Sequence, residues 1–204
     1  MSDILCVTNR SLCREDFLTR VEKLAAAKPA GIILREKDLT AAEYRHLARE
    51  VMALCKAQGV PCILHSFVQA ALDLGSKEIH LPLPALRGLQ EKEKARFTVL
   101  GASCHSVEDA LEAQALGCTY LTAGHIFDTG CKAGLPGRGL DFLREVCQAV
   151  SIPVYAIGGI GPENIGSVRA AGAAGACVMS GAMRCEPVKD YFNQLEKGEA
   201  HDAL

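Results

Sequence analysis

The sequence predicts a single α/β domain over residues 1–204 with the architecture of a (β/α)8 barrel, the TIM barrel. Short apolar and β-branched runs alternate with longer segments of helical period along the whole chain. Eight strand-like runs favour barrel closure, because parallel neighbours need crossover connections, which helices usually supply. The length of 204 residues is close to the lower limit of roughly 200 for this fold, so a second domain is not expected. The structural alternative is an open, flavodoxin-like sheet.

The expected elements follow one another in strict alternation. The strand-like runs span residues 4–9, 31–36, 61–65, 78–82, 98–103, 120–124, 153–159 and 176–181. The helical segments span residues 17–27, 42–58, 67–75, 107–117, 140–150, 163–172 and 188–198. Only a short polar segment is expected after the fourth strand. Glycines at positions 59, 75, 117 and 172 mark helix ends just before the next strand.

Composition and charge exclude several classes of partner. The formal net charge of −2 gives no general attraction to nucleic acid or to an anionic membrane, so neither is expected as a partner. The first ten residues lack the pattern of a targeting segment, and no apolar stretch is long enough to span a bilayer, which predicts a cytoplasmic protein. The ten cysteines are scattered without a CxxC pair, so we expect reduced core residues and no metal site.

The ends of the seventh and eighth strands predict a phosphate site. Gly158 and Gly159 follow the seventh strand, and Ser180 and Gly181 follow the eighth. Small residues at these places let backbone N–H groups face an anion, and barrels of this class often bind phosphate there. The alternative is that the glycines only form tight turns.

The sixth loop, GHIFDTGCKAGLPGRG, is longer than most strand-to-helix connections and carries several reactive side chains. His125 follows the strand end, where its side chain is expected to face the barrel mouth. With an ordinary pKa near 6.5, a histidine can take and give a proton at neutral pH, so His125 is the candidate catalytic residue. Thr129 and Lys132 are expected to complete this wall of the pocket.

Further candidates follow the second and fifth strands. Arg35 and Lys37 are two residues apart, which places both on one face of an extended segment, where they would converge on an anion. Ion pairs with Glu36 or Asp38 are the alternative. Ser103 is a candidate substrate contact. Ser106, at the start of the next helix, could be its cap. His80 is expected at the barrel interior or rim.

Together these motifs resemble the thiamin phosphate synthase and TenI superfamily. The similarity runs through VTNR, ILREK, LGASCHS, GHIFDTGCKAGLPGRG, IPVYAIGGI and VMSGA, and therefore covers nearly the whole chain. The resemblance implies a (β/α)8 barrel, a homodimer and a thiazole phosphate as the small-molecule ligand. It also implies a catalytic role for His125.

Two branches of this superfamily differ in chemistry. A synthase carries an Asn-Asp pair after the third strand and an acidic segment after the fourth; the chain instead has His65-Ser66 and HLPLPA, and Ile33 replaces a glutamine. Because these places lack carboxylate ligands for a hard cation, and because GHIFDTGCK resembles TenI, the expected activity is that of a thiazole tautomerase, an isomerase without a cofactor. The first alternative is a divergent, magnesium-dependent thiamin phosphate synthase, a transferase. The second is a non-catalytic regulatory protein that senses thiazole phosphate.

Overall fold

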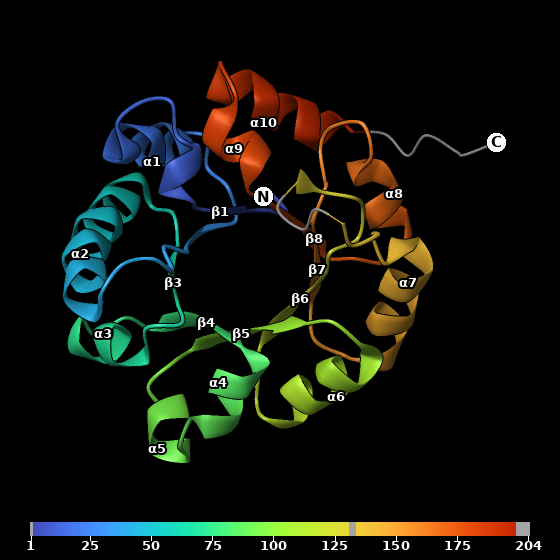
Figure 1. Cartoon of the computed structure of the whole chain (residues 1–204), viewed down its shortest axis with the longest axis horizontal. Helices are drawn as coiled ribbons and strands as arrows, with labels where there is room; N and C mark the ends of the chain where they lie inside the picture. Colours follow the sequence, from blue (N-terminus) through green and yellow to red (C-terminus); the bar gives the residue numbers. More distant parts are fainter. Residues whose placement is uncertain (1, 131–133, 199–204) are drawn as a thin grey trace.

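The computed structural model describes residues 2–130 and 134–198. Its strands are all parallel and close on themselves in the order β1 to β8, with β8 paired to β1. Figure 1 shows the helices as a ring around these strands. The (β/α)8 barrel expected from the sequence is therefore confirmed. The strands are β1 (Ile4–Val7), β2 (Gly31–Leu34), β3 (Cys62–His65), β4 (Glu78–Pro82), β5 (Val99–Cys104), β6 (Tyr120–Gly124), β7 (Val154–Ile157) and β8 (Gly175–Val178).

The helices lie between the strands as the alternation predicts. Gly59, Gly75, Gly117 and Gly172 all have a positive φ, which confirms them as helix-ending residues. Ser106 accepts a hydrogen bond from the Asp109 N–H at 3.1 Å, which confirms it as a cap. The helices are η1 (Arg10–Leu12), α1 (Phe17–Ala26), α2 (Ala41–Gln58), α3 (Val68–Asp73), α4 (Leu83–Gly88), α5 (Glu91–Lys94), α6 (Val107–Ala115), α7 (Gly139–Ala149), α8 (Ile165–Ala170), α9 (Ser180–Arg184) and α10 (Val188–Lys197).

Two segments differ from the expectation. The segment after β4 is not a simple polar connection but forms α4 and α5, because Leu83 and Leu86 are buried one turn apart and a Gln90–Glu93 capping box starts α5. The run at 176–181 is strand only to Val178, and the chain turns at once into α9.

The core has two parts, separated by the sheet. One fills the space between the strands and the helices, and the other fills the barrel interior with side chains such as Leu5, Ile33, Ile63 and Cys177. Side chains alternate across each strand, so every second residue enters the barrel. In the part of the chain that the structure describes, no helix combines the length and apolarity needed to cross a bilayer.

Candidate active site

Polar side chains replace apolar ones at the carboxyl ends of the strands. Ile33 and Ile63 lie inside the barrel, so Arg35 and His65, two residues further on, point into its mouth. The strand register places His65 beside His80 and Ser103 beside Thr122. These positions form one polar layer at the end of the barrel where such enzymes place their active sites.

His80 is the centre of this layer. Its Nδ1 lies 2.9 Å from the Tyr120 hydroxyl, and its Nε2 lies 2.8 Å from Ser103 Oγ. The side chain is buried, and this burial lowers the pKa of His80 to about 3. The imidazole is therefore neutral, with one nitrogen donating and the other accepting. The structure places His80 in the barrel interior, and places the candidate Ser103 in direct contact with it.

His65 is neutral for similar reasons. Burial, followed by electrostatic interactions with His80, Lys37 and Arg35 that disfavour a protonated ring, lowers the pKa of His65 to about 3. The register of β2 and β3 pairs Leu34 with Leu64, so Arg35 and His65 follow side by side at the ends of these strands. Arg35 is half-buried, Lys37 is exposed, and the Arg35 guanidinium makes no hydrogen bond or ion pair with the described residues. Arg35 is thus available to an anionic ligand at the mouth.

Glu36, between these two cations, faces away from the mouth. Its carboxylate accepts a hydrogen bond from Thr8 Oγ1 at 2.6 Å and from the Arg10 N–H at 3.0 Å. Burial raises its pKa, while these hydrogen bonds act in the opposite direction. Arg10 also pairs with Asp38 at 2.6 Å. Arg10, and not Arg35, therefore provides the ion pairs of Glu36 and Asp38.

The sixth loop folds back on itself above β6. The half-buried His125 lies with Nε2 3.2 Å from the Leu135 carbonyl, and Asp128 accepts a hydrogen bond from the Gly137 N–H at 2.7 Å. The Arg138 N–H donates to the His125 carbonyl at 2.9 Å and holds the far end of the loop in place. Backbone groups of Leu135, Gly137 and Arg138 thus hold the far end of the loop against its beginning.

Of the two remaining predicted residues of the sixth loop, the structure describes one. Thr129 is half-buried, and Lys132 lies outside the described residues. The carbonyl of Gly124, just before His125, accepts a hydrogen bond from His105 Nδ1 at 2.8 Å, so His105 supports the loop from the neighbouring strand end.

The seventh loop contacts the sixth at its two glycines. A Cβ on Gly158 would lie 2.3 Å from His125 Cβ, and a Cβ on Gly159 would lie 2.6 Å from the Asp128 carbonyl oxygen. Both residues also have a positive φ. Within the described residues, neither N–H donates to a protein acceptor, so both can serve a ligand. The geometry therefore places the predicted phosphate loop directly against His125.

Ser180 and Gly181 lie at the start of α9 and not in an extended loop. A Cβ on Gly181 would lie 2.0 Å from the Tyr191 hydroxyl, so packing against α10 explains why a glycine occupies this position. Since β7 and β8 are neighbours, the start of α9 lies on the same side of the mouth as Gly158.

A divalent cation finds no prepared site among the described side chains. No group of three His, Cys, Asp or Glu side chains there is arranged to hold a metal. The buried carboxylate of Glu36 is already bonded to Thr8 and Arg10, and the strand ends where a synthase carries acidic residues hold His65 and His80. The described residues therefore do not fit a preassembled magnesium centre.

Fold and site together define a (β/α)8-barrel protein whose mouth carries cationic side chains beside glycine-containing loops. The chain belongs to the thiamine monophosphate synthase family, whose model matches residues 4–182. The resemblance to the thiamin phosphate synthase and TenI superfamily is thereby confirmed.

Two similar sequences and one solved structure have names that refer to thiamine phosphate synthesis. The chain is 33% identical over 198 residues to a thiamine-phosphate synthase of Syntrophomonas wolfei, covering 94% of this chain and 93% of that protein. It is 34% identical over 180 residues to thiamine-phosphate synthase 2 of Streptococcus pneumoniae, covering 86% and 84%. Thiamine phosphate pyrophosphorylase from Pyrococcus furiosus superposes with a TM-score of 0.82 at 27% identity, covering 96% of this chain and 94% of that one.

These comparisons correct the expected activity. Relatives 30–35% identical over most of the chain are named as synthases, which are transferases, so the isomerase prediction and the tautomerase activity are wrong. The error came from giving two strand ends without carboxylates and one histidine-containing loop more weight than the rest of the chain. Arg35 and Lys37 place positive charge at the mouth.

Proposed function

We propose that the protein is a thiamine-phosphate synthase, which couples a pyrimidine pyrophosphate to a thiazole phosphate at the carboxyl end of the barrel. The observation that carries this proposal is the similarity to proteins of that name over more than nine-tenths of both chains. The site is compatible with it, because both substrates are anionic and the mouth offers cations and free backbone N–H groups.

The proposed reaction is a displacement at carbon. The bond between the pyrimidine methylene carbon and the pyrophosphate oxygen breaks, and pyrophosphate leaves with the electron pair. The lone pair of the thiazole nitrogen forms the new C–N bond, which leaves the ring positively charged. No side chain has to exchange a proton in this step, so charge stabilisation and alignment of the two substrates are the main tasks of the protein.

Residues of the mouth divide these tasks in the proposal. Gly158 and Gly159 bind the thiazole phosphate through their N–H groups, assisted by the amides of Ser180 and Gly181 at the start of α9. Arg35 and Lys37 stabilise the departing pyrophosphate, whose negative charge grows as the bond breaks. The first set follows β7 and β8, and the second follows β2, so both lie at the end of the barrel where active sites of this fold are found.

The side chains between these two sets align the substrates. Ser103, oriented by His80, contacts the substrate from the opposite wall, and Thr129 and His125 contribute the sixth-loop wall. The proposal assigns no step to a metal ion. It includes a homodimer, as the family resemblance implies, and a cytoplasmic location, because charged phosphate esters do not cross a bilayer unaided.

The test is direct synthesis. The purified protein is incubated with the pyrimidine pyrophosphate, the thiazole phosphate and magnesium chloride, and thiamine phosphate and released pyrophosphate are measured. We expect both products in equal amounts, and neither when one substrate is left out. Binding of the thiazole phosphate with no thiamine phosphate formed, with or without added magnesium, would contradict the proposal and favour a sensor.

A further inference from the structure

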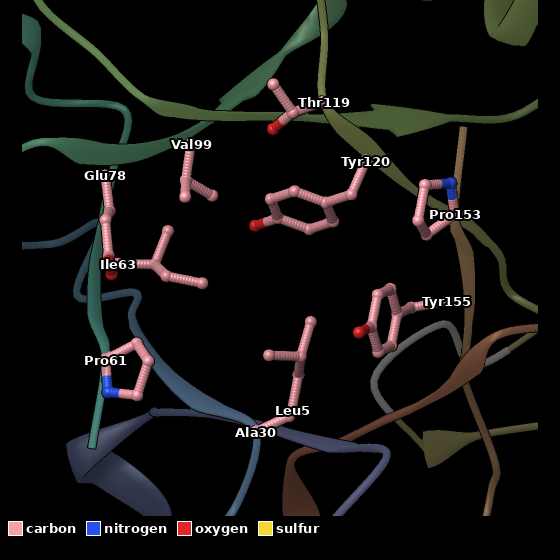
Figure 2. A pocket seen from close by; sticks show the side chains of 10 residues that line it. All are labelled: Leu5, Ala30, Pro61, Ile63, Glu78, Val99, Thr119, Tyr120, Pro153 and Tyr155. Carbon is pink, nitrogen blue, oxygen red and sulfur yellow. The ribbon is translucent and has the colours of Figure 1, made fainter. Parts of the chain in front are cut away.

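A cavity lies at the opposite end of the barrel from the candidate active site. It has a volume of about 260 Å³ and is lined by residues at the amino ends of the strands (Figure 2). Leu5, Ile63 and Val99 give it apolar walls. Pro61 and Pro153, at its rim, are exposed, while Ile63 is buried on its floor, so a small molecule can enter from solvent.

One acidic side chain, Glu78 at the first position of β4, stands among these apolar walls. Its Oε2 atom is buried without a hydrogen-bond partner, and its carboxylate takes part in no ion pair within the described residues. Burial alone raises the pKa of Glu78, which shows that no neighbouring cation compensates for the loss of water. A carboxylate in this condition destabilises the protein unless something binds it.

Two aromatic rings face the same space. The rings of Tyr120 and Tyr155 lie edge to face with their centroids 5.9 Å apart and an interplanar angle of 87°. Figure 2 shows both hydroxyl groups directed toward the middle of the cavity, with Glu78 on the opposite wall. A carboxylate across an apolar space from aromatic rings is a combination that binds an organic cation, by charge at the carboxylate and by packing of the apolar part of the ligand against the rings.

We propose that this cavity binds a small organic monocation, a primary ammonium or amidinium carried on one apolar ring. The cationic head lies against Glu78 Oε2, and the ring fills the space between Leu5, Ile63 and Val99. Size supports this class, because a cavity of about 150 Å³ holds benzene, and a ring with a short ammonium arm needs more room than that. An inorganic divalent cation is disfavoured, since a single carboxylate provides too few oxygen ligands.

Benzylamine, which is charged at neutral pH, is a suitable probe, and benzyl alcohol is its neutral counterpart of the same shape. Both are titrated into ¹⁵N-labelled full-length protein, and the backbone amide shifts of β4, β5 and β6 are followed. We expect benzylamine to bind with a Kd on the order of 1 mM or tighter and to shift amides at the amino ends of these strands. Benzyl alcohol is expected to bind at least about tenfold more weakly.

Glu78→Gln keeps the shape of the side chain and removes its charge. Glu145→Gln is the matched control, since Glu145 is exposed on α7 away from the cavity and has no ion pair among the described residues. Glu78→Gln should weaken benzylamine binding about tenfold and leave benzyl alcohol binding unchanged, whereas Glu145→Gln should change neither. Val99→Phe, which fills the cavity but keeps the carboxylate, should abolish both.

Equal affinities for the charged and neutral probes, unchanged benzylamine affinity in Glu78→Gln, or shifts only at the carboxyl ends of the strands would each overturn the proposal. None of these outcomes depends on thiamine phosphate synthesis, which takes place at the other end of the barrel. Circular dichroism and the Tm of each variant show whether it is folded before it is titrated.

Discussion

The hydroxyl of Tyr120 lies 2.9 Å from Nδ1 of His80, inside the barrel and on the side away from the mouth. Nε2 of the same ring lies 2.8 Å from Ser103 Oγ. The neutral imidazole therefore connects Tyr120 to Ser103 at the mouth. Tyr120 packs so closely over Gly101 that a Cβ there would lie 2.2 Å from its ring. The orientation of Ser103 at the mouth therefore depends on a tyrosine at the first position of β6, at the amino end of the barrel.

Tyr120→Phe removes the hydroxyl but keeps the ring. We expect the free energy of unfolding to fall by about 1–3 kcal/mol, because a buried histidine nitrogen loses its partner. In thiamine phosphate synthesis, kcat should fall by a larger factor than KM rises, because Ser103 is less well oriented. Urea unfolding and steady-state kinetics measure these changes. Tyr155→Phe is the control: its hydroxyl has no partner among the described residues, so a change within about 0.5 kcal/mol is expected. Equal losses in the two variants would contradict this view of Tyr120.

The two buried histidines predict how stability depends on pH. Their pKa values are about 3 in the folded protein, against an ordinary value near 6.5 in an unfolded chain. Between these limits the unfolded chain binds more protons than the folded protein. The free energy of unfolding therefore falls as the pH is lowered from about 6.5 toward 3. The fall is up to about 1.4 kcal/mol per pH unit for each histidine. Glu36 and Glu78, whose pKa values are raised, act in the opposite direction above about pH 4.5.

The histidine contribution can be isolated by comparing unfolding curves of the native protein and His80→Gln across this pH range. The variant should lose stability less steeply on acidification, whatever its stability at neutral pH. Parallel curves would show that His80 is not the group responsible.

Gly158→Ala should disturb the contact between the sixth and seventh loops. The new methyl group would overlap His125, and the backbone at φ +104° disfavours a side chain in any case. Gly59→Ala is a matched control, because Gly59 also has a positive φ but nothing within 4 Å of the added atom. We expect Gly59→Ala to cost about 1 kcal/mol. Gly158→Ala should cost more and should also weaken binding of thiazole phosphate, measured by calorimetry.

Arg35→Gln should lower kcat/KM for thiamine phosphate formation by about tenfold to a hundredfold, because a charged hydrogen bond to the pyrophosphate is lost. Arg49→Gln, on the exposed side of α2, removes the same charge away from the mouth and should have almost no effect. A comparable fall in both variants would indicate general electrostatic attraction and not a direct contact.

Arg20 connects the two ends of the chain. It is buried, donates to the Cys185 carbonyl at 2.8 Å, and pairs with Glu15 and Glu186 at 2.8 and 2.9 Å. Arg20→Met should cost about 1–3 kcal/mol, because the Cys185 carbonyl loses its donor while Lys23 still pairs with Glu15 and Glu186. Arg87→Met breaks an exposed pair with Glu112 and should cost less than about 1 kcal/mol. Chemical denaturation distinguishes the two, and similar costs would refute the assigned role of Arg20.

The sequence was most informative where one physical requirement governs a whole segment. Apolar runs alternating with helical segments predicted the barrel and its eight strands, and glycines with positive φ marked helix ends correctly. The helix α4 was missed because its apolar stripe of Leu83 and Leu86 is only one turn long. Arg35 and Ser103 became candidates because polar residues at strand ends stand out from the apolar runs before them, and their roles stay predictions.

The contacts of these residues were harder to foresee. Tyr120 lies a whole strand away from the mouth, and only the closed barrel brings it to His80. The pairing of Glu36 with Thr8 and Arg10 likewise depends on β1 and β2 lying side by side. Activity was the least accessible property, since local differences at His65 and His80 pointed away from the synthases that the whole chain resembles.

Closure of the barrel also has a consequence for synthesis of the chain. Ile4 pairs with Ala176, so one edge of β1 has no partner until β8 has been synthesised. Contacts this distant in sequence slow folding, and an unpaired strand edge is prone to pair with another chain. The nascent protein therefore carries its first strand half-paired until β8 is made, which exposes that edge to pairing with another chain during synthesis.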